Sequence, residues 1–100
     1  MRMYQLCGGT FTWDSEKARM NLAKHGVSFE EACEALLDLF HVDEDAGVPE
    51  EDRVGTIGYS GSGKLLYVVS AIREDSWRII SARSATPIER KRYEAENQNI

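Results

Sequence analysis

Three β-prone runs in the second half of the chain constrain its fold more than any other feature. They cover residues 54–59, 65–72 and 77–83, and only five and four residues separate them. Gaps this short leave no room for a crossover helix, so successive strands must run antiparallel. The sequence therefore predicts an antiparallel meander.

Helix signals precede the meander. Asp14 is a good N-cap and Gly26 suits a left-handed C-terminal position, which predicts a helix over residues 14–25. Ser28 begins a second helix, with Glu31 placed to complete a capping box. We expect this helix to bury one face, formed by residues at helical spacing: Phe29, Ala32, Cys33, Leu36, Leu37 and Phe40.

A short helix is expected to close the chain. Thr86 is a suitable N-cap, Pro87 fits the first helical position and Glu89 completes a capping box. Two helices, a meander and a final helix form an α+β pattern. We expect an irregular N-terminal lead (1–10), one domain (11–94) and a C-terminal tail (95–100).

Several classes of protein are excluded by length and motif. One hundred residues allow one domain, and no apolar run approaches the ~20 residues of a membrane span. No secretory signal is evident, so a cytoplasmic location is expected, with Cys33 a buried thiol. Residues 58–64 match the start of a phosphate-binding loop, but Leu65 follows where Ser or Thr is required, so a hairpin is expected instead. The four Cys and His residues lack metal-site spacing, and we expect neither metal nor cofactor.

Charge is distributed unevenly along the chain. In a chain of net charge −5, residues 14–52 hold 12 acidic and 3 basic residues, whereas residues 53–92 hold 3 acidic and 8 basic residues. The stretch 43–52 carries Gly, Pro and repelling carboxylates, and a solvated loop is expected there. The second half is therefore basic enough to hold a nucleic-acid site despite the overall acidity.

Arginines along the predicted strands are candidates for phosphate binding, because the guanidinium fork matches phosphate oxygens. Strand alternation places Arg78 and Arg83 on opposite faces unless a bulge or the strand end re-aims one of them. Solvent-facing arginines that pair with carboxylates are the alternative interpretation. His25 and Tyr93 are further candidates for proton transfer, although a helix-terminal His and a helical Tyr at the core edge are commonly structural.

Two ordered blocks resemble the BrnT family of bacterial toxins. They are W-D-x-x-K-x-x-x-N-x-x-K-H-G-V-S-F from Trp13 and R-I-I-S-A-R-x-A-T from Arg78, and the similarity spans residues 11–94. The resemblance implies a RelE-like ribonuclease with a curved antiparallel sheet. It implies metal-independent RNA cleavage that restrains translation and growth until an antitoxin binds.

The resemblance also implies residue roles and partners. By position it favours four catalytic residues on the sheet and last helix, Arg53, Arg78, Arg83 and Tyr93. His25 is added to them as a candidate acid or base on its residue type alone, and the resemblance places it in a secondary basic group. Lys17 and Lys24, together with Arg73, are expected to bind substrate. The implied partners are RNA and a BrnA-like ribbon–helix–helix antitoxin, with DNA contacted only through the toxin–antitoxin complex. The alternative function is a non-catalytic module that binds an antitoxin-like protein and regulates transcription with it.

Overall fold

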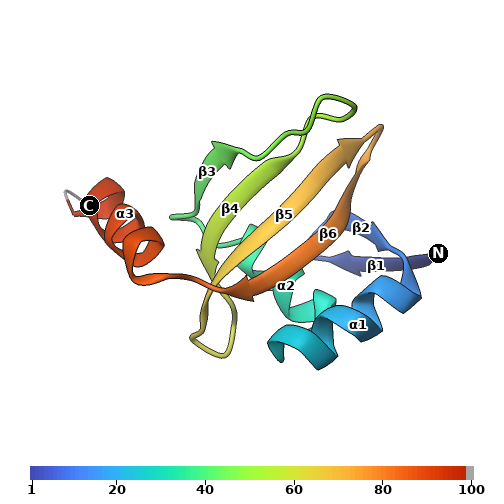
Figure 1. The fold of residues 1–100 in the computed structure, drawn as a ribbon, viewed down its shortest axis with the longest axis horizontal. Helices are drawn as coiled ribbons and strands as arrows, with labels where there is room; N and C mark the ends of the chain where they lie inside the picture. The colour runs from blue at the N-terminus through green and yellow to red at the C-terminus, as the bar shows by residue number, and fades with distance from the viewer. Residues whose placement is uncertain (99–100) are drawn as a thin grey trace.

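The predicted meander forms the centre of a six-stranded sheet in a computed structural model that describes residues 1–98 (Figure 1). The described elements are, in chain order, β1 (Arg2–Leu6), β2 (Gly9–Trp13), α1 (Ser15–His25), α2 (Phe29–Leu36), β3 (Val42–Asp45), β4 (Val54–Tyr59), β5 (Leu65–Arg73), β6 (Ser76–Ser84) and α3 (Pro87–Asn97). The strand order is β1-β2-β6-β5-β4-β3. Only the β2–β6 pair is parallel among these described strands.

The N-terminal lead is not irregular, and this expectation is wrong. Residues 1–10 contribute β1 and the start of β2, which pair antiparallel up to Leu6 and Gly9. Cys7 and Gly8 have φ values of 50° and 83°, the left-handed conformation that a two-residue hairpin turn requires. A turn formed by only two residues explains why composition alone did not reveal the hairpin.

The helix ends are largely as expected. Asp14 caps α1, and Gly26 ends it with a φ of 70°. Ser28 caps α2, but the capping box does not close, because the Glu31 carboxylate instead accepts hydrogen bonds from Ser60 and Ser62 of the β4–β5 turn. That turn joins two strands, which confirms the predicted hairpin.

The second helix ends at Leu36 rather than at Phe40, which is exposed. Asp38 explains the early end. Its carboxylate accepts hydrogen bonds from the backbone of Phe40 and Tyr59 and from the Tyr93 hydroxyl. These bonds hold the chain in a turn and connect α2, β4 and α3.

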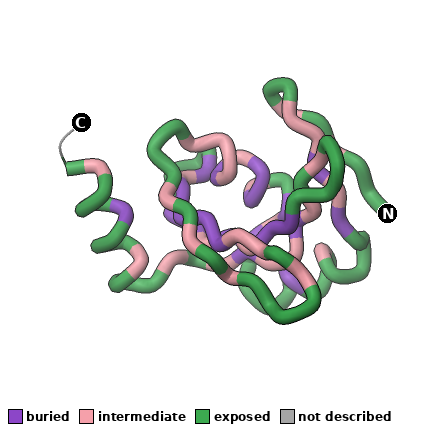
Figure 2. The backbone as a smooth tube through the Cα atoms, turned by 90° about the horizontal axis from the view of Figure 1, so that it is seen from above, coloured by how far each residue is buried: buried purple, intermediate pink, exposed green. Residues whose placement is uncertain are grey.

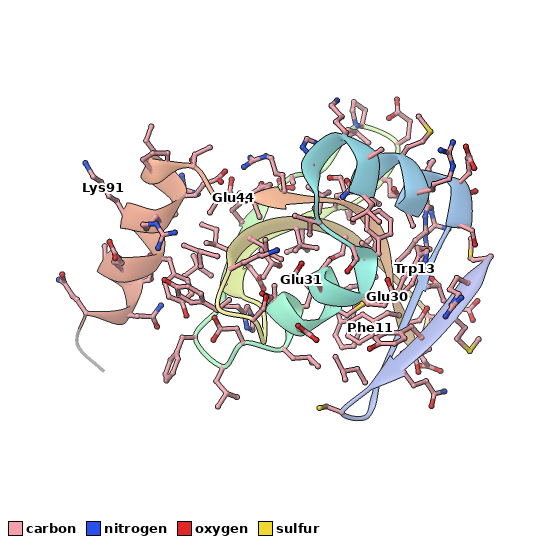
Figure 3. The ribbon with its side chains drawn as sticks, turned by 90° about the horizontal axis from the view of Figure 1, so that it is seen from below. Phe11, Trp13, Glu30, Glu31, Glu44 and Lys91 are labelled. Carbon is pink, nitrogen blue, oxygen red and sulfur yellow. The ribbon has the colours of Figure 1, made fainter. Side chains whose placement is uncertain are left out.

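The main core lies between α2 and one face of the sheet, hereafter the helix face (Figure 2). Phe11 and Trp13 of β2 point towards α2 (Figure 3), and Phe29 packs edge-on against Trp13. Cys33 is buried there as predicted, and burial raises the pKa of its thiol to about 12. The opposite face, hereafter the open face, is covered only at one end, where Tyr93 of α3 packs on Ile57 and neighbouring residues.

Two further boundaries differ from expectation. The acidic stretch 43–52 is not wholly a loop, because Val42–Asp45 forms the edge strand β3 with a regular antiparallel register to β4. Helix α3 has the predicted capping box and continues to Asn97, so part of the predicted tail 95–100 is helical, and residues 99–100 lie outside the described residues. No helix within residues 1–98 combines the length and apolarity needed to cross a membrane.

Candidate active site

A β-bulge on β6 brings the two key arginines to the same face. Ile79 pairs with Ser70 while Ser81 pairs with Val69, so Ile80 is an extra residue in the ladder. Ile79 and Ala82 are consequently both buried in the core on the helix face. By alternation, Arg78 and Arg83 therefore both lie on the open face, as the sequence allowed if a bulge were present.

Three arginines converge on one carboxylate at the open face. Arg53 Nε donates to Glu51 Oε1 at 2.9 Å, Arg73 Nη2 donates to Glu51 Oε2, and Arg78 Nη1 lies 3.5 Å from the same oxygen. Hydrogen bonds from Arg53 and then Arg73 lower the pKa of Glu51 to about 2. We call Arg53, Arg73 and Arg78 the arginine cluster.

The arginine cluster keeps an excess of positive charge. Three guanidinium groups surround a single carboxylate, and Arg73 is the most exposed of the three, with 53% of its side chain open to solvent. Such a group of planar donors is suited to the oxygens of a phosphate. The cluster is therefore the strongest anion-binding feature that the predicted residues form.

Arg83 has different surroundings. Its two terminal nitrogens donate to the two oxygens of Glu89 at 2.9 Å each, and its guanidinium carbon lies 4.5 Å above the Tyr67 ring. The bond to Glu89 raises the pKa of Arg83, and the bond from Arg83 lowers the pKa of Glu89. Glu89 also accepts from the Thr86 backbone, so this pair anchors α3 to the end of β6.

Tyr67 lies beside Arg83 on the open face, facing Gly55 of β4. A Cβ at residue 55 would overlap the Tyr67 hydroxyl, so the glycine makes room for the ring. Burial, and then the nearby Glu44 carboxylate, raise the pKa of Tyr67. Arg92 of α3 pairs with Glu44 at the same end of the face.

Three other predicted residues gather in a groove between α1 and β6. Lys17, Lys24 and His25 line it together with Ile80 and Ser81, and it has a volume of about 520 Å³. Ser81 lies between Arg78 and Arg83 along β6. The groove, which we call the α1 groove, therefore borders the strand that carries both arginines.

Tyr93 does not join the arginines. Its side chain is buried against Tyr59, and its hydroxyl donates to Asp38 at 2.7 Å. Burial, and then the hydrogen bond to Asp38, raise the pKa of Tyr93. The structure therefore gives this tyrosine a packing role and separates it from the arginine cluster.

Sequence reasoning did not identify Glu51 or Tyr67. Glu51 belongs to the acidic stretch, and nothing in its local sequence shows that it meets two distant arginines. Tyr67 could have been found, because alternation within Leu66–Tyr67–Val68 separates it from its buried apolar neighbours. Within residues 1–98, no three His, Cys, Asp or Glu side chains lie close enough together to hold a metal ion.

Comparisons with known proteins identify the family of the chain and support its fold. A family model described as the ribonuclease toxin BrnT of type II toxin–antitoxin systems matches residues 13–89. Among solved structures, the chain is similar to the Brucella abortus ribonuclease toxin BrnT, with 24% identity, a TM-score of 0.57, and coverage of 76% of this chain and 95% of that one. That likeness establishes the fold. No curated protein sequence matches.

Proposed function

The chain belongs to the BrnT family of ribonuclease toxins of type II toxin–antitoxin systems, and from this premise we propose that it cleaves RNA on the open face, at the arginine cluster. The observation that carries the proposal is the convergence of Arg53, Arg73 and Arg78 on one point. In the absence of RNA, the Glu51 carboxylate occupies that point. In the complex with RNA, the scissile phosphate takes the place of the carboxylate.

The arginines supply most of the catalytic effect in this proposal. Attack by the RNA 2′-hydroxyl on the adjacent phosphorus puts additional negative charge on the phosphate oxygens, and positioned guanidinium groups stabilise that charge. The fixed positive charge does the work that a divalent cation does in other nucleases. We therefore propose that cleavage needs no metal.

Glu51 is the proposed proton acceptor. While it is bound to the arginines its pKa is about 2, so it is a poor base. When the phosphate takes over those arginines, the pKa of Glu51 rises towards its ordinary value, and the carboxylate can accept the 2′-hydroxyl proton. The bond from phosphorus to the 5′-oxygen then breaks, that oxygen takes a proton from water, and a 2′,3′-cyclic phosphate remains.

The α1 groove is the proposed path for the RNA on one side of the scissile phosphate. Lys17 and Lys24 add positive charge there, and Ser81 connects the groove to β6. His25 contributes to binding in this arrangement and not to proton transfer. The guanidinium group of Arg83 is bound to Glu89. Arg83 therefore positions the Tyr67 ring and holds α3 against the end of β6.

The test uses purified protein freed of antitoxin and a single-stranded RNA oligonucleotide. We expect cleavage in EDTA, and we expect no cleavage of the same oligonucleotide with 2′-O-methyl groups. Arg78→Ala should slow cleavage by roughly 10²–10³-fold, the usual effect of removing one charge-stabilising donor. Lys64→Ala, which removes a positive charge at the opposite end of the β4–β5 hairpin, should leave the rate unchanged.

Two results would overturn the proposal. One is loss of activity in EDTA that added Mg²⁺ restores, and the other is full activity in Arg78→Ala and Glu51→Gln together. We further propose that the protein acts in the cytoplasm, where RNA is available, that translation and growth stop as a result, and that a BrnA-like ribbon–helix–helix antitoxin neutralises it. The family match does not favour the non-catalytic alternative.

A further inference from the structure

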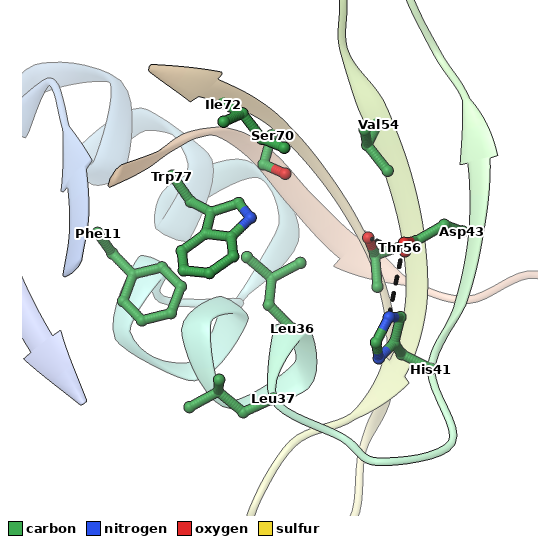
Figure 4. Close-up of a pocket in the computed structure, with 10 residues that line it drawn as sticks. All are labelled: Phe11, Leu36, Leu37, His41, Asp43, Val54, Thr56, Ser70, Ile72 and Trp77. Atoms are coloured by element: carbon green, nitrogen blue, oxygen red, sulfur yellow. Dashed lines mark hydrogen bonds and ion pairs between the residues drawn. The ribbon is translucent and has the colours of Figure 1, made fainter. Parts of the chain in front are cut away.

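An apolar groove remains open on the helix face, on the side of the sheet opposite the arginine cluster (Figure 4). It has a volume of about 260 Å³. The groove extends from the end of helix α2 at Leu36 to Ile72 and Trp77, which flank the β5–β6 turn. The groove is lined there mainly by apolar side chains: Phe11, Leu36, Leu37, Val54, Ile72 and Trp77.

Two of these large apolar side chains are exposed. Ile72 is 65% exposed, and Trp77 is 37% exposed although one side of its ring stacks on Phe11 at 5.4 Å. Apolar surface of this kind, gathered in a concave site, is typical of a place where another molecule binds.

The groove continues into an acidic depression. Asp43 and Val54 line both sites, and the depression is otherwise lined by Glu44, Asp45, Asp52 and Arg53. Asp43 also accepts a hydrogen bond from Thr56 and lies 3.5 Å from His41 Nε2, which fixes its carboxylate at the junction (Figure 4). Carboxylates therefore outnumber basic groups by four to one beside the apolar groove.

We infer that this groove and depression bind the antitoxin, through a segment that places apolar side chains next to Lys or Arg residues. Charge complementarity decides the occupant. RNA is repelled by the carboxylates, and a second copy of this chain carries the same net charge of −5. A basic and apolar protein segment satisfies both halves of the site.

The inference deepens the proposed function and rests on it, because a toxin of this type requires an antitoxin. The apolar groove itself lies on the helix face, because Ile72 and Trp77 alternate along their strands with Arg73 and Arg78. The two sites nevertheless adjoin, since Arg53 also lines the acidic depression and Ile72 also lines a pocket with Arg73 and Arg78.

The experiment measures the Kd of the full chain for the antitoxin encoded beside it. Ile72→Glu places a charge in the apolar groove, and we expect it to raise the Kd roughly tenfold or more. Ile88→Glu is the matched control, because Ile88 is an equally exposed isoleucine on α3, at 72%. It should leave the Kd unchanged.

A second pair of variants tests the charge argument without disturbing apolar packing. Asp52→Lys reverses an exposed charge in the depression, and we expect weaker binding whose deficit shrinks as salt increases. Glu94→Lys makes the same change on the exposed side of α3 and should have no effect. RNA cleavage by the two control variants, Ile88→Glu and Glu94→Lys, should match that of the wild type.

The outcomes distinguish this inference from the proposed function. Wild-type affinity in both Ile72→Glu and Asp52→Lys would overturn the inference, even if RNA cleavage is intact. Dissociation of a homodimer by Ile72→Glu would also overturn it, since the occupant would then be a second copy. A chain that cleaves no RNA but binds the antitoxin through these residues would sink the proposed function and support the inference.

Discussion

The side-chain amide of Asn21 in α1 forms two hydrogen bonds with the backbone of Ala82 in β6. Asn21 Nδ2 donates to the Ala82 carbonyl at 2.8 Å, and the Ala82 N–H donates to Asn21 Oδ1 at 3.1 Å. Pairing between β2 and β6 extends only as far as Arg78, so the amide continues the ladder where β2 ends. The same amide nitrogen donates to the Val27 carbonyl.

Asn21→Ala should destabilise the fold by roughly 2–4 kcal/mol, because the buried N–H and C=O of Ala82 lose their partners. Thermal or denaturant unfolding would measure this loss, with Met20→Ala on the exposed side of α1 as the control. A variant as stable as the wild type would show that the amide does not hold this edge.

Glu51→Gln should lower the stability of the folded protein at neutral pH. It should also make that stability fall less steeply as the pH decreases. The pKa of Glu51 is about 2 in the folded protein, against an ordinary value of 4.5. Its contribution is therefore complete above about pH 4.5 and is lost as the pH falls towards 2. The difference in Tm between wild type and Glu51→Gln should be largest near pH 6 and should shrink steadily below pH 4.5.

The control for this measurement is Glu94→Gln, an exposed carboxylate on α3. Its difference in Tm from the wild type should stay near zero over the same range. A Glu51→Gln deficit that is constant from pH 6 to pH 2.5 would contradict the assignment of the arginine contacts.

Gly58→Ala should be destabilising because α2 lies directly on β4 at this position. A Cβ at residue 58 would overlap the backbone carbonyl oxygen of Ala35, which cannot rotate away. Overpacking of this kind costs about 1–3 kcal/mol. Gly61→Ala is the matched control, because its Cβ would meet only the flexible end of the Glu34 side chain.

Arg73→Ala should weaken RNA binding in a manner that depends on salt. If Arg73 contacts one phosphate, its removal should lower the slope of log K against log salt concentration by about 0.7 for single-stranded RNA. The 2′-O-methyl oligonucleotide allows binding to be measured without cleavage. Lys24→Ala in the α1 groove should have a similar effect, whereas Lys64→Ala should leave the slope as it is.

Local signals in the sequence determined most of the elements. Asp14, Gly26 and Thr86 set helix ends, because a cap depends on side chains within a few residues of it. Alternation and short turns set the three central strands for the same reason. The sequence likewise identified the arginines on these strands as candidate site residues, through the motif that begins at Arg78.

The tertiary structure alone decided which of those residues lie close together. A bulge at Ile80 put Arg78 and Arg83 on one face, and chain folding carried Glu51 into the arginine cluster from a stretch that looked like solvated loop. The three hydrogen bonds to Asp38 hold the turn that follows α2, and the end of this helix borders the apolar groove. These features depend on contacts between residues far apart in the chain, and no local pattern of caps, turns or alternation encodes such contacts.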